Sequence, residues 1–120
     1  MELTMYGISN CDTIRKARKW LDEKAITYRF HDYRKEGIDE GLAKELMALV
    51  PLKELINRRS TTWRNLDEES KEKIIADDHT VALMVMLDEP TIIRRPLLVD
   101  DKGVLVGFSA EKYERFLNQQ

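Results

Sequence analysis

Hydrophobic and polar positions follow two different periods along the first third of the chain. Residues 3–6 form a short apolar run that Gly7 ends, which predicts a strand. From residue 10 or 11 to residue 24, apolar positions recur at helical spacing opposite a basic face, which predicts an amphipathic helix. Residues 26–33 alternate and predict a second strand, parallel to the first because a helix joins them. The pattern indicates a βαβ unit.

The middle of the chain carries only helical periods. Apolar residues recur at helical spacing over residues 38–49, after a predicted cap at Asp39. Pro51 can open a short helix over 52–56, because a first-turn proline loses no hydrogen bond. Two more helical segments are predicted at 66–77 and 80–87. We therefore expect a helical insert at about residues 38–90.

Strand signals return near the end of the chain. Residues 97–99 and 104–106 are apolar and are joined by the turn sequence DDKG, which predicts an antiparallel hairpin. Ser109 can then cap a last helix over 110–117. The order βαβ, helical insert, ββα predicts an α/β protein with a thioredoxin-like fold. Residues 1–120 would form a single domain with a four-stranded mixed sheet and an inserted helical subdomain.

Composition limits the classes of function. The chain has 120 residues, of which 42% are hydrophobic and 35% charged, as expected for one soluble globular domain. A net charge of -2 provides no overall field to attract nucleic acid or an anionic membrane. The longest apolar run, residues 81–87, is far shorter than the roughly 18 residues that a membrane helix needs. The start of the chain shows no secretion signal, so we expect a cytoplasmic protein.

Cys11 is the only cysteine, which excludes an internal disulfide and a four-thiolate zinc site. His31 and His79 lack the local spacing of metal ligands, so we expect no metal and no bound cofactor. Cys11 stands where the first strand gives way to the first helix, and backbone N–H groups at a helix start stabilise a thiolate. The alternative is an inert, buried thiol. The polar neighbours Asn10, Asp12 and Thr13 favour a cradle for an anion that contains a reactive thiol.

Four stretches, taken together and in order, carry a resemblance to a known family over nearly the whole chain. They are YGISNCDTIRKARKWL (6–21), LINRRSTTWRNL (55–66), IIRRPLLVD (92–100) and GVLVGFSAEKY (103–113). The sequence resembles the arsenate-reductase-like (ArsC) proteins, in particular the branch that holds the Spx-type regulators and the YffB-type reductases. The resemblance implies a nucleophilic Cys11, an anion-binding Arg95 and a cis bond before Pro96.

Departures from the family pattern narrow the expected chemistry. Asn57 and Phe108 stand where arsenate reductases carry two further arginines, which argues against arsenate as the substrate. Ile14 replaces the second cysteine of the Spx-type pair, so a two-cysteine switch is impossible. The stretch RSTTWR fits the YffB-type branch, and this resemblance implies a glutathione-dependent thiol reductase.

A single thiol that attacks an oxidised centre needs a second thiol to release it. We therefore expect glutathione as the co-substrate, or a glutaredoxin as the partner, acting on a small anionic or thiol substrate. In this scheme Cys11 attacks while the helix start and Arg95 stabilise the thiolate and the substrate. The remaining predicted substrate- or anion-binding residues are Asn10, Asp12, Thr13, Arg15, Arg58, Arg59 and Pro96.

Two other interpretations are open. The first is an Spx-like binding module that contacts RNA polymerase, in which Cys11 is vestigial or modulatory. The second is nucleic-acid binding through a mixed basic and aromatic stretch at residues 58–64, which could stack on bases. Acidic residues follow that stretch at once, so we predict no nucleic-acid partner.

Overall fold

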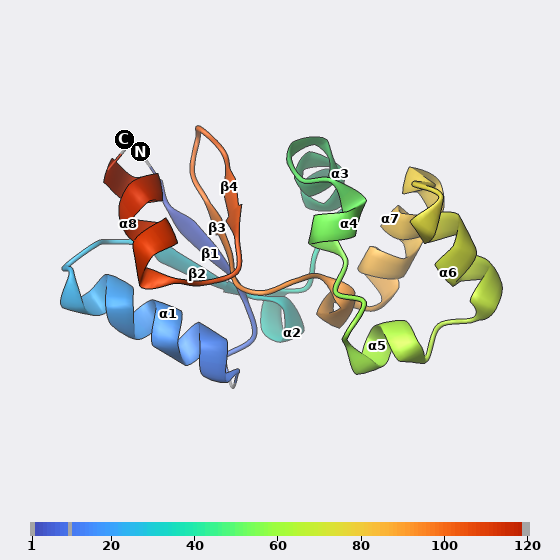
Figure 1. The fold of residues 1–120 in the computed structure, drawn as a ribbon, viewed down its shortest axis with the longest axis horizontal. Helices are drawn as coiled ribbons and strands as arrows, with labels where there is room; N and C mark the ends of the chain where they lie inside the picture. The colour runs from blue at the N-terminus through green and yellow to red at the C-terminus, as the bar shows by residue number, and fades with distance from the viewer. Residues whose placement is uncertain (1, 10, 119–120) are drawn as a thin grey trace. The chain divides into compact units, whose positions relative to one another are not determined.

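A computed structural model describes residues 2–9 and 11–118 of the chain (Figure 1). The chain divides into two compact units. The first combines the segment up to Asp32 with the segment from Arg95 onward, and the second runs from Tyr33 to Arg94. The helical insert predicted at about residues 38–90 lies inside the second unit. Each unit is described by itself.

The first unit is built on a four-stranded mixed sheet with the strand order β2-β1-β3-β4. Its central strand β1 pairs in parallel with β2 and antiparallel with β3, and β3 pairs antiparallel with β4. The predicted mixed sheet and the C-terminal hairpin are confirmed. The strands are β1 (Thr4–Gly7), β2 (Arg29–Asp32), β3 (Leu97–Val99) and β4 (Val104–Val106).

Helices α1 (Asp12–Glu23) and α8 (Ala110–Asn118) cover one face of this sheet (Figure 1). Trp20 of α1 meets Tyr113 of α8 edge to face, with ring centroids 5.7 Å apart. The buried side chains between the helices and the sheet are Leu3, Met5, Ile14, Ala17, Leu21, Leu98 and Tyr113. The order of strands and helices in this unit is that of a thioredoxin-like fold, as predicted.

Short polar contacts fix the last elements of the first unit. In the DDKG turn, Asp100 Oδ1 accepts hydrogen bonds from the N–H groups of Lys102 at 2.8 Å and Gly103 at 3.0 Å. This Asp side chain holds the turn that joins β3 to β4. The Ser109 hydroxyl accepts from the Lys112 N–H at 3.1 Å, which confirms Ser109 as the cap of α8.

The second unit is helical. An isolated antiparallel bridge between Ile56 and Ile93 ties two distant stretches of it together. Four of its helices start at a side chain that caps the first turn, each cap stabilising its helix by about 0.5–2 kcal/mol. The caps are Asp39, Ser60, Asp67 and Asp78. The helices are α2 (Tyr33–Glu36), α3 (Glu40–Leu49), α4 (Leu52–Leu55), α5 (Thr61–Arg64), α6 (Glu68–Ile75), α7 (His79–Asp88) and the 3₁₀ turn η1 (Pro90–Ile92).

The second predicted strand, residues 26–33, is too long at both ends. After α1 the chain turns through Ala25, whose φ is 56°, and the Ile26 N–H donates to the Leu21 carbonyl. The residues after the helix are therefore used to close its C-terminus rather than to extend the sheet. At the other end Tyr33 starts α2 instead of ending β2. Sequence periodicity did not predict α2, α5 or η1, because each has four residues or fewer.

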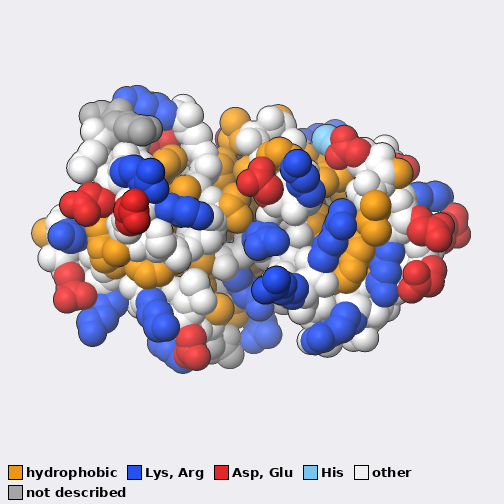
Figure 2. Space-filling model, in the orientation of Figure 1, with side chains coloured by type: hydrophobic (Ala, Val, Ile, Leu, Met, Phe, Trp, Pro, Cys, Tyr) orange, Lys and Arg blue, Asp and Glu red, His pale blue; other side chains and the backbone are white. Residues whose placement is uncertain are grey.

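Charges of both signs are spread over the surface. On the face drawn in Figure 2, acidic side chains lie among the Lys and Arg side chains of both units, so neither sign covers that face. This agrees with a net charge of -2. Within the described residues, no helix combines the length and the apolar character that crossing a bilayer requires.

Candidate functional site

Cys11 is the N-cap residue of α1, directly after the loop that follows β1. Its backbone is extended, with φ -96° and ψ 133°, and its carbonyl accepts the first helical hydrogen bond, from the Arg15 N–H at 3.0 Å. Its own N–H donates to the Ile8 carbonyl at 3.3 Å. The thiol is half-buried. This geometry puts the sulfur at the positive end of the helix, where the first N–H groups have no carbonyl partner within the helix.

The surroundings of Cys11 lower the pKa of its thiol. Burial alone acts in the opposite direction and raises the pKa, but the backbone N–H groups of Ile14 and Thr13 and the guanidinium of Arg95 outweigh it. The N–H groups of Ile14 and Thr13 belong to the first turn of α1, so the positive end of the helix supplies part of this effect. All of these groups favour the thiolate, which is the nucleophilic form of cysteine.

Arg95 lies at the edge of the sheet where β1 ends. This is because β3, which follows Arg95 in the chain, runs antiparallel to β1 and begins at that edge. Tyr6 pairs with Leu97, so Arg95 and Pro96 directly precede β3 beside the end of β1. The peptide bond between Arg95 and Pro96 is cis, as the resemblance implies. The buried Pro96 accepts a hydrogen bond through its carbonyl from the Gly107 N–H at 2.9 Å.

Gly7 allows these parts to come close together. A Cβ added at this glycine would lie 2.2 Å from Ile14 Cδ1 and 3.7 Å from Arg95 Cβ. The first distance is far below any real contact, so a side chain here would force the buried Ile14 side chain, or the helix that carries it, to shift. The glycine therefore lets the start of α1 and the start of β3 pack against one strand end.

Asp32 is a buried carboxylate at the same edge of the sheet. It is 4% exposed, ends β2 and pairs with Gly7 across the parallel ladder. One of its carboxylate oxygens accepts a hydrogen bond from the Ser9 N–H at 3.2 Å. Asp32 thus holds the loop that leads from β1 to Cys11. A side chain in this position can help to orient the thiol.

The structure gives the predicted residues near Cys11 different surroundings. Thr13 is exposed and contributes its backbone N–H to the thiol, while Pro96 is buried next to Arg95. Arg15 forms an ion pair with Asp12 on the exposed surface of the first turn of α1. Because both side chains are more than half exposed, this pair contributes little to stability. Arg15 is therefore engaged locally with Asp12 when no substrate is bound.

The structure does not place the other three predicted residues relative to the thiol. Asn10 falls outside the described residues. Arg58 and Arg59 belong to the second unit, where the Arg58 guanidinium lies 5.6 Å from the centre of the Trp63 ring. The Arg59 N–H donates to the Asn57 side chain at 3.0 Å. Their role toward the substrate stays a prediction.

At two positions the resemblance implies an arginine that this chain lacks. The residues found there, Asn57 and Phe108, make contacts within the fold instead. Asn57 donates its N–H to the Ile92 carbonyl at 2.8 Å, and its own carbonyl accepts from the Ser60 hydroxyl at 2.7 Å. Phe108 packs edge to face on Tyr113, with ring centroids 4.8 Å apart. Neither side chain carries a charge that could hold a small oxyanion.

Sequence reasoning missed Gly7 and Asp32 as site residues. The sequence predicts Gly7 only as the end of a strand, and the close approach of Ile14 becomes visible only once the helix packs on the sheet. A signal for Asp32 was available, since it stands next to the last residue of the predicted second strand, near the edge where parallel strands end.

The described residues contain no group of three His, Cys, Asp or Glu side chains that could hold a metal ion. The donors around the thiol are backbone N–H groups and a guanidinium, which bind anions rather than cations. Chemically, the site offers a thiol of lowered pKa and, beside it, groups that neutralise negative charge on a substrate.

Comparison with known proteins shows the family of this chain. A solved structure of a YFFB protein is 40% identical to the chain, covers 94% of it and 96% of its own length, and superposes with a TM-score of 0.86. An arsenate reductase (ArsC) related protein from Brucella melitensis is also 40% identical, with 98% and 95% coverage and a TM-score of 0.74. The global transcriptional regulator Spx of Enterococcus faecalis is 32% identical over 96% of this chain and 86% of its own.

These relatives include both the reductase-related and the regulatory members of the branch to which the sequence shows a resemblance. The ArsC family itself matches residues 6–116, which takes in both units and all of the described site. The chain belongs to the ArsC family, in the branch of the Spx and YffB-type proteins.

Proposed function

We propose that this protein is a monothiol reductase of the arsenate-reductase-like type, which acts on an oxidised thiol or an oxyanion with glutathione or a glutaredoxin as the second thiol. One observation carries the proposal: Cys11 stands at the start of α1, where Arg95 and two backbone N–H groups lower its pKa. A structural cysteine needs none of these groups.

For a disulfide substrate the reaction is a pair of thiol exchanges. The Cys11 thiolate attacks one sulfur of the substrate, a Cys11–substrate disulfide forms, and the other sulfur leaves as a thiolate. A glutathione thiolate then attacks the substrate sulfur of this mixed disulfide and releases Cys11 as a thiolate. One half of the substrate has then left as a thiolate, and the other half leaves in a disulfide with glutathione. A second glutathione thiolate reduces that disulfide, so the two electrons come from two glutathione molecules, which end as oxidised glutathione.

For an oxyanion substrate the same thiolate attacks the oxidised central atom, and a protonated oxygen leaves as water. Glutathione then attacks the Cys11 sulfur of the adduct, the central atom keeps the two electrons, and Cys11 is left in a mixed disulfide with glutathione. A further thiol, from glutathione or a glutaredoxin, restores the Cys11 thiolate. Arg95 suits the binding of the anion in both the adduct and the free substrate.

The second thiol has to come from outside the chain, because Cys11 is the only cysteine. Glutathione suits the role of this second thiol, since it also carries carboxylates that arginines bind through two parallel hydrogen bonds. Arg15, Arg58 and Arg59 are the candidates for this contact. Arg15 would have to leave Asp12 to make it.

Arsenate is not the substrate that this site favours. The Brucella melitensis relative is arsenate reductase related, and arsenate would suit a site with several cations. Here Asn57 and Phe108 occupy two positions at which the resemblance places arginines, and both have structural contacts. Oxidised glutathione carries its negative charge on carboxylates that are separate from its disulfide, so it fits a site with one arginine beside the thiol better.

Mass spectrometry of the protein treated with oxidised glutathione tests the proposal. We expect one glutathione per chain, bound at Cys11, which added glutathione or glutaredoxin removes. Cys11→Ser should take up none. A Cys11 thiol that stays unmodified in the folded protein under conditions where a cysteine-containing peptide reacts would reject the reductase function.

The relationship to the Spx regulator of Enterococcus faecalis favours a second candidate, a regulatory module that binds RNA polymerase. Ile14 stands where the resemblance places the second cysteine, so such a module would act without a two-cysteine switch. Co-purification of RNA polymerase with the tagged protein, unchanged in Cys11→Ser, would support this candidate. Absence of RNA polymerase together with glutathione uptake at Cys11 would support the reductase.

A further inference from the structure

Helix α7 of the second unit is apolar around its whole circumference, with the sequence HTVALMVMLD. A helix of this kind is normally buried on all sides. Here only Ala82 and Met86 are buried, while Met84 is 65% exposed and Leu87 is 36% exposed. One side of an apolar helix is therefore left open to solvent within its own unit.

The exposed side of α7 has the spacing of a binding face. Thr80, Leu83, Met84 and Leu87 stand at positions i, i+3, i+4 and i+7, which lie on one face of a helix. We call these four residues the α7 stripe. Methionine is flexible and adapts to differently shaped partners, which is why it is frequent at surfaces that bind helices.

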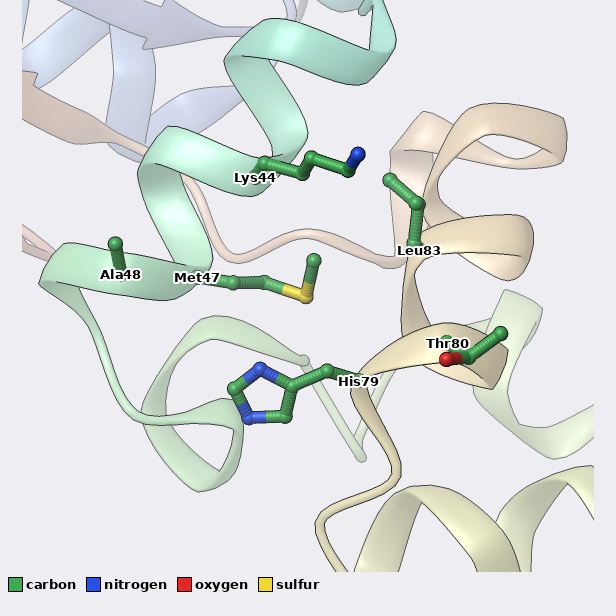
Figure 3. A pocket seen from close by; sticks show the side chains of 6 residues that line it. All are labelled: Lys44, Met47, Ala48, His79, Thr80 and Leu83. Carbon is green, nitrogen blue, oxygen red and sulfur yellow. The ribbon is translucent and has the colours of Figure 1, made fainter.

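A hollow lies on each side of the α7 stripe. Toward α6 there is an open groove of about 660 Å³, whose lining includes Leu66, Asp67, Met84, Leu87 and Asp88. Toward α3 there is a hollow of about 280 Å³, in which Lys44 and Met47 extend toward Leu83 and His79 (Figure 3). A ridge between two hollows matches the way one helix packs against another, with ridges fitting into grooves.

The charge of the larger groove indicates which charge its partner carries. Both charged residues that line it, Asp67 and Asp88, are acidic. The hydroxyl and the N–H of Ser70 donate to the Asp67 carboxylate at 2.8 and 3.0 Å, and these hydrogen bonds lower its pKa and keep it ionised. The groove therefore presents negative charge beside an apolar floor.

We propose that the α7 stripe and the groove toward α6 dock a basic amphipathic helix of another protein. Its apolar side chains would contact Met84 and Leu87, and its Lys or Arg side chains would meet Asp67 and Asp88. This surface belongs to the second unit and Cys11 belongs to the first. The proposal does not depend on the proposed reductase function.

Charge and size argue against a second copy of this chain as the occupant. A two-fold pairing would place the same surface on both sides of the interface, so two acidic grooves would face each other. A helix of ten residues is about 15 Å long, and its four stripe residues fall short of the roughly 800 Å² per partner of a stable interface. A transient contact with a basic helix suits this surface.

A pair of labelled helical peptides tests the proposal. Both have Leu at positions i, i+3, i+4 and i+7, and their other positions are mainly Lys in one peptide and mainly Glu in the other. Fluorescence anisotropy with the full chain should show the Lys peptide bound at least about tenfold more tightly than the Glu peptide, with a marked dependence on salt. Met84→Gln/Leu87→Gln should weaken the Lys peptide about tenfold.

Matched variants test whether the peptide binds to this groove or to any exposed apolar surface. Leu49 and Ile75 are 50% and 56% exposed in the same unit and line neither the groove nor the α3 hollow. Leu49→Gln/Ile75→Gln should therefore leave binding unchanged, while Asp67→Asn/Asp88→Asn should lower the affinity for the Lys peptide and its salt dependence. Circular dichroism checks that each variant folds.

Three results would overturn the proposal. These are equal affinity for the two peptides, an undiminished affinity in Met84→Gln/Leu87→Gln, or the same loss in Leu49→Gln/Ile75→Gln. A dimer in sedimentation experiments that Met84→Gln/Leu87→Gln dissociates would assign this face to a second copy and would also overturn it.

Discussion

The N–H of Ser9, which stands two residues before Cys11, donates a hydrogen bond of 3.2 Å to the buried carboxylate of Asp32. The bond joins the loop that follows β1 to the end of β2. The pKa of a thiol depends on the direction of nearby N–H groups, so we expect a side chain that holds this loop to influence the pKa of Cys11.

We therefore expect Asp32→Ala to raise the pKa of the Cys11 thiol toward its ordinary value and to slow its alkylation. The loss of a hydrogen bond to a charged group should also lower the free energy of unfolding by about 1.5–3 kcal/mol. Asp32→Asn keeps an acceptor for the Ser9 N–H and should restore most of the thiol acidity. Thiolate absorbance against pH measures the pKa of Cys11 in both variants. An unchanged pKa in Asp32→Ala would show that Asp32 does not influence the thiol.

Arg95 is expected to stabilise the thiolate directly. Arg95→Ala should raise the pKa of Cys11 and weaken the binding of oxidised glutathione, because both the guanidinium charge and its hydrogen bond are lost. Arg95→Lys should restore part of the pKa effect through its charge but not the two-pronged binding of an anion. Arg94→Ala is the matched control, since Arg94 is exposed and ends the other unit. Equal effects of the two alanine variants would contradict a specific role for Arg95.

The acidity of Cys11 predicts a pH dependence of reactivity and of stability. Alkylation by iodoacetamide should rise with pH at a midpoint below the value of about 8.5 for a free cysteine. A thiol whose pKa is lower in the folded state adds stability that is complete above its unfolded pKa and is lost as the pH falls through its folded pKa. The wild type should therefore gain stability over Cys11→Ser as the pH rises across that interval.

Denaturant unfolding of both proteins at several pH values gives this difference. A difference that does not change with pH would mean that the thiol has the same pKa in the folded and unfolded chains. Because Cys11→Ser also changes the packing of a half-buried side chain, only the pH-dependent part of the difference bears on the prediction.

Gly7 is expected to tolerate no side chain. In Gly7→Ala the new Cβ would meet Cδ1 of the fully buried Ile14, so α1 or the strand has to move, at a cost of about 1–3 kcal/mol. Ile14→Val removes that Cδ1 atom and should recover part of the loss in the double variant. Gly103→Ala, where no atom lies within 4 Å of the added Cβ, is the control and should change stability little. Thermal unfolding measures all three.

The sequence predicted the sheet of the first unit well because its signals are local. The turn DDKG places both strands of the hairpin, and the basic and apolar faces of α1 define that helix within two residues of its observed start. Asp39 and Ser109 were also identified as caps from their residue type and position. These features depend on contacts between residues close in the chain.

The parts that sequence could not predict depend on residues far apart in the chain. The closeness of Gly7 to Ile14 and Arg95 follows from the packing of a helix and two strands, which no local pattern encodes. The bond from Ser9 to Asp32 is of the same kind. The short helices α2 and α5 each make about one turn, too little for a hydrophobic period to develop.

The strand order β2-β1-β3-β4 has a consequence for synthesis of the protein. The second unit is a continuous stretch of chain, whereas the central strand β1 obtains its neighbour β3 only after that whole stretch has been made. Arg95 is the first residue to follow it. A nascent chain therefore carries Cys11 long before the guanidinium that lowers its pKa, so the thiol gains its full reactivity only when the discontinuous unit is complete.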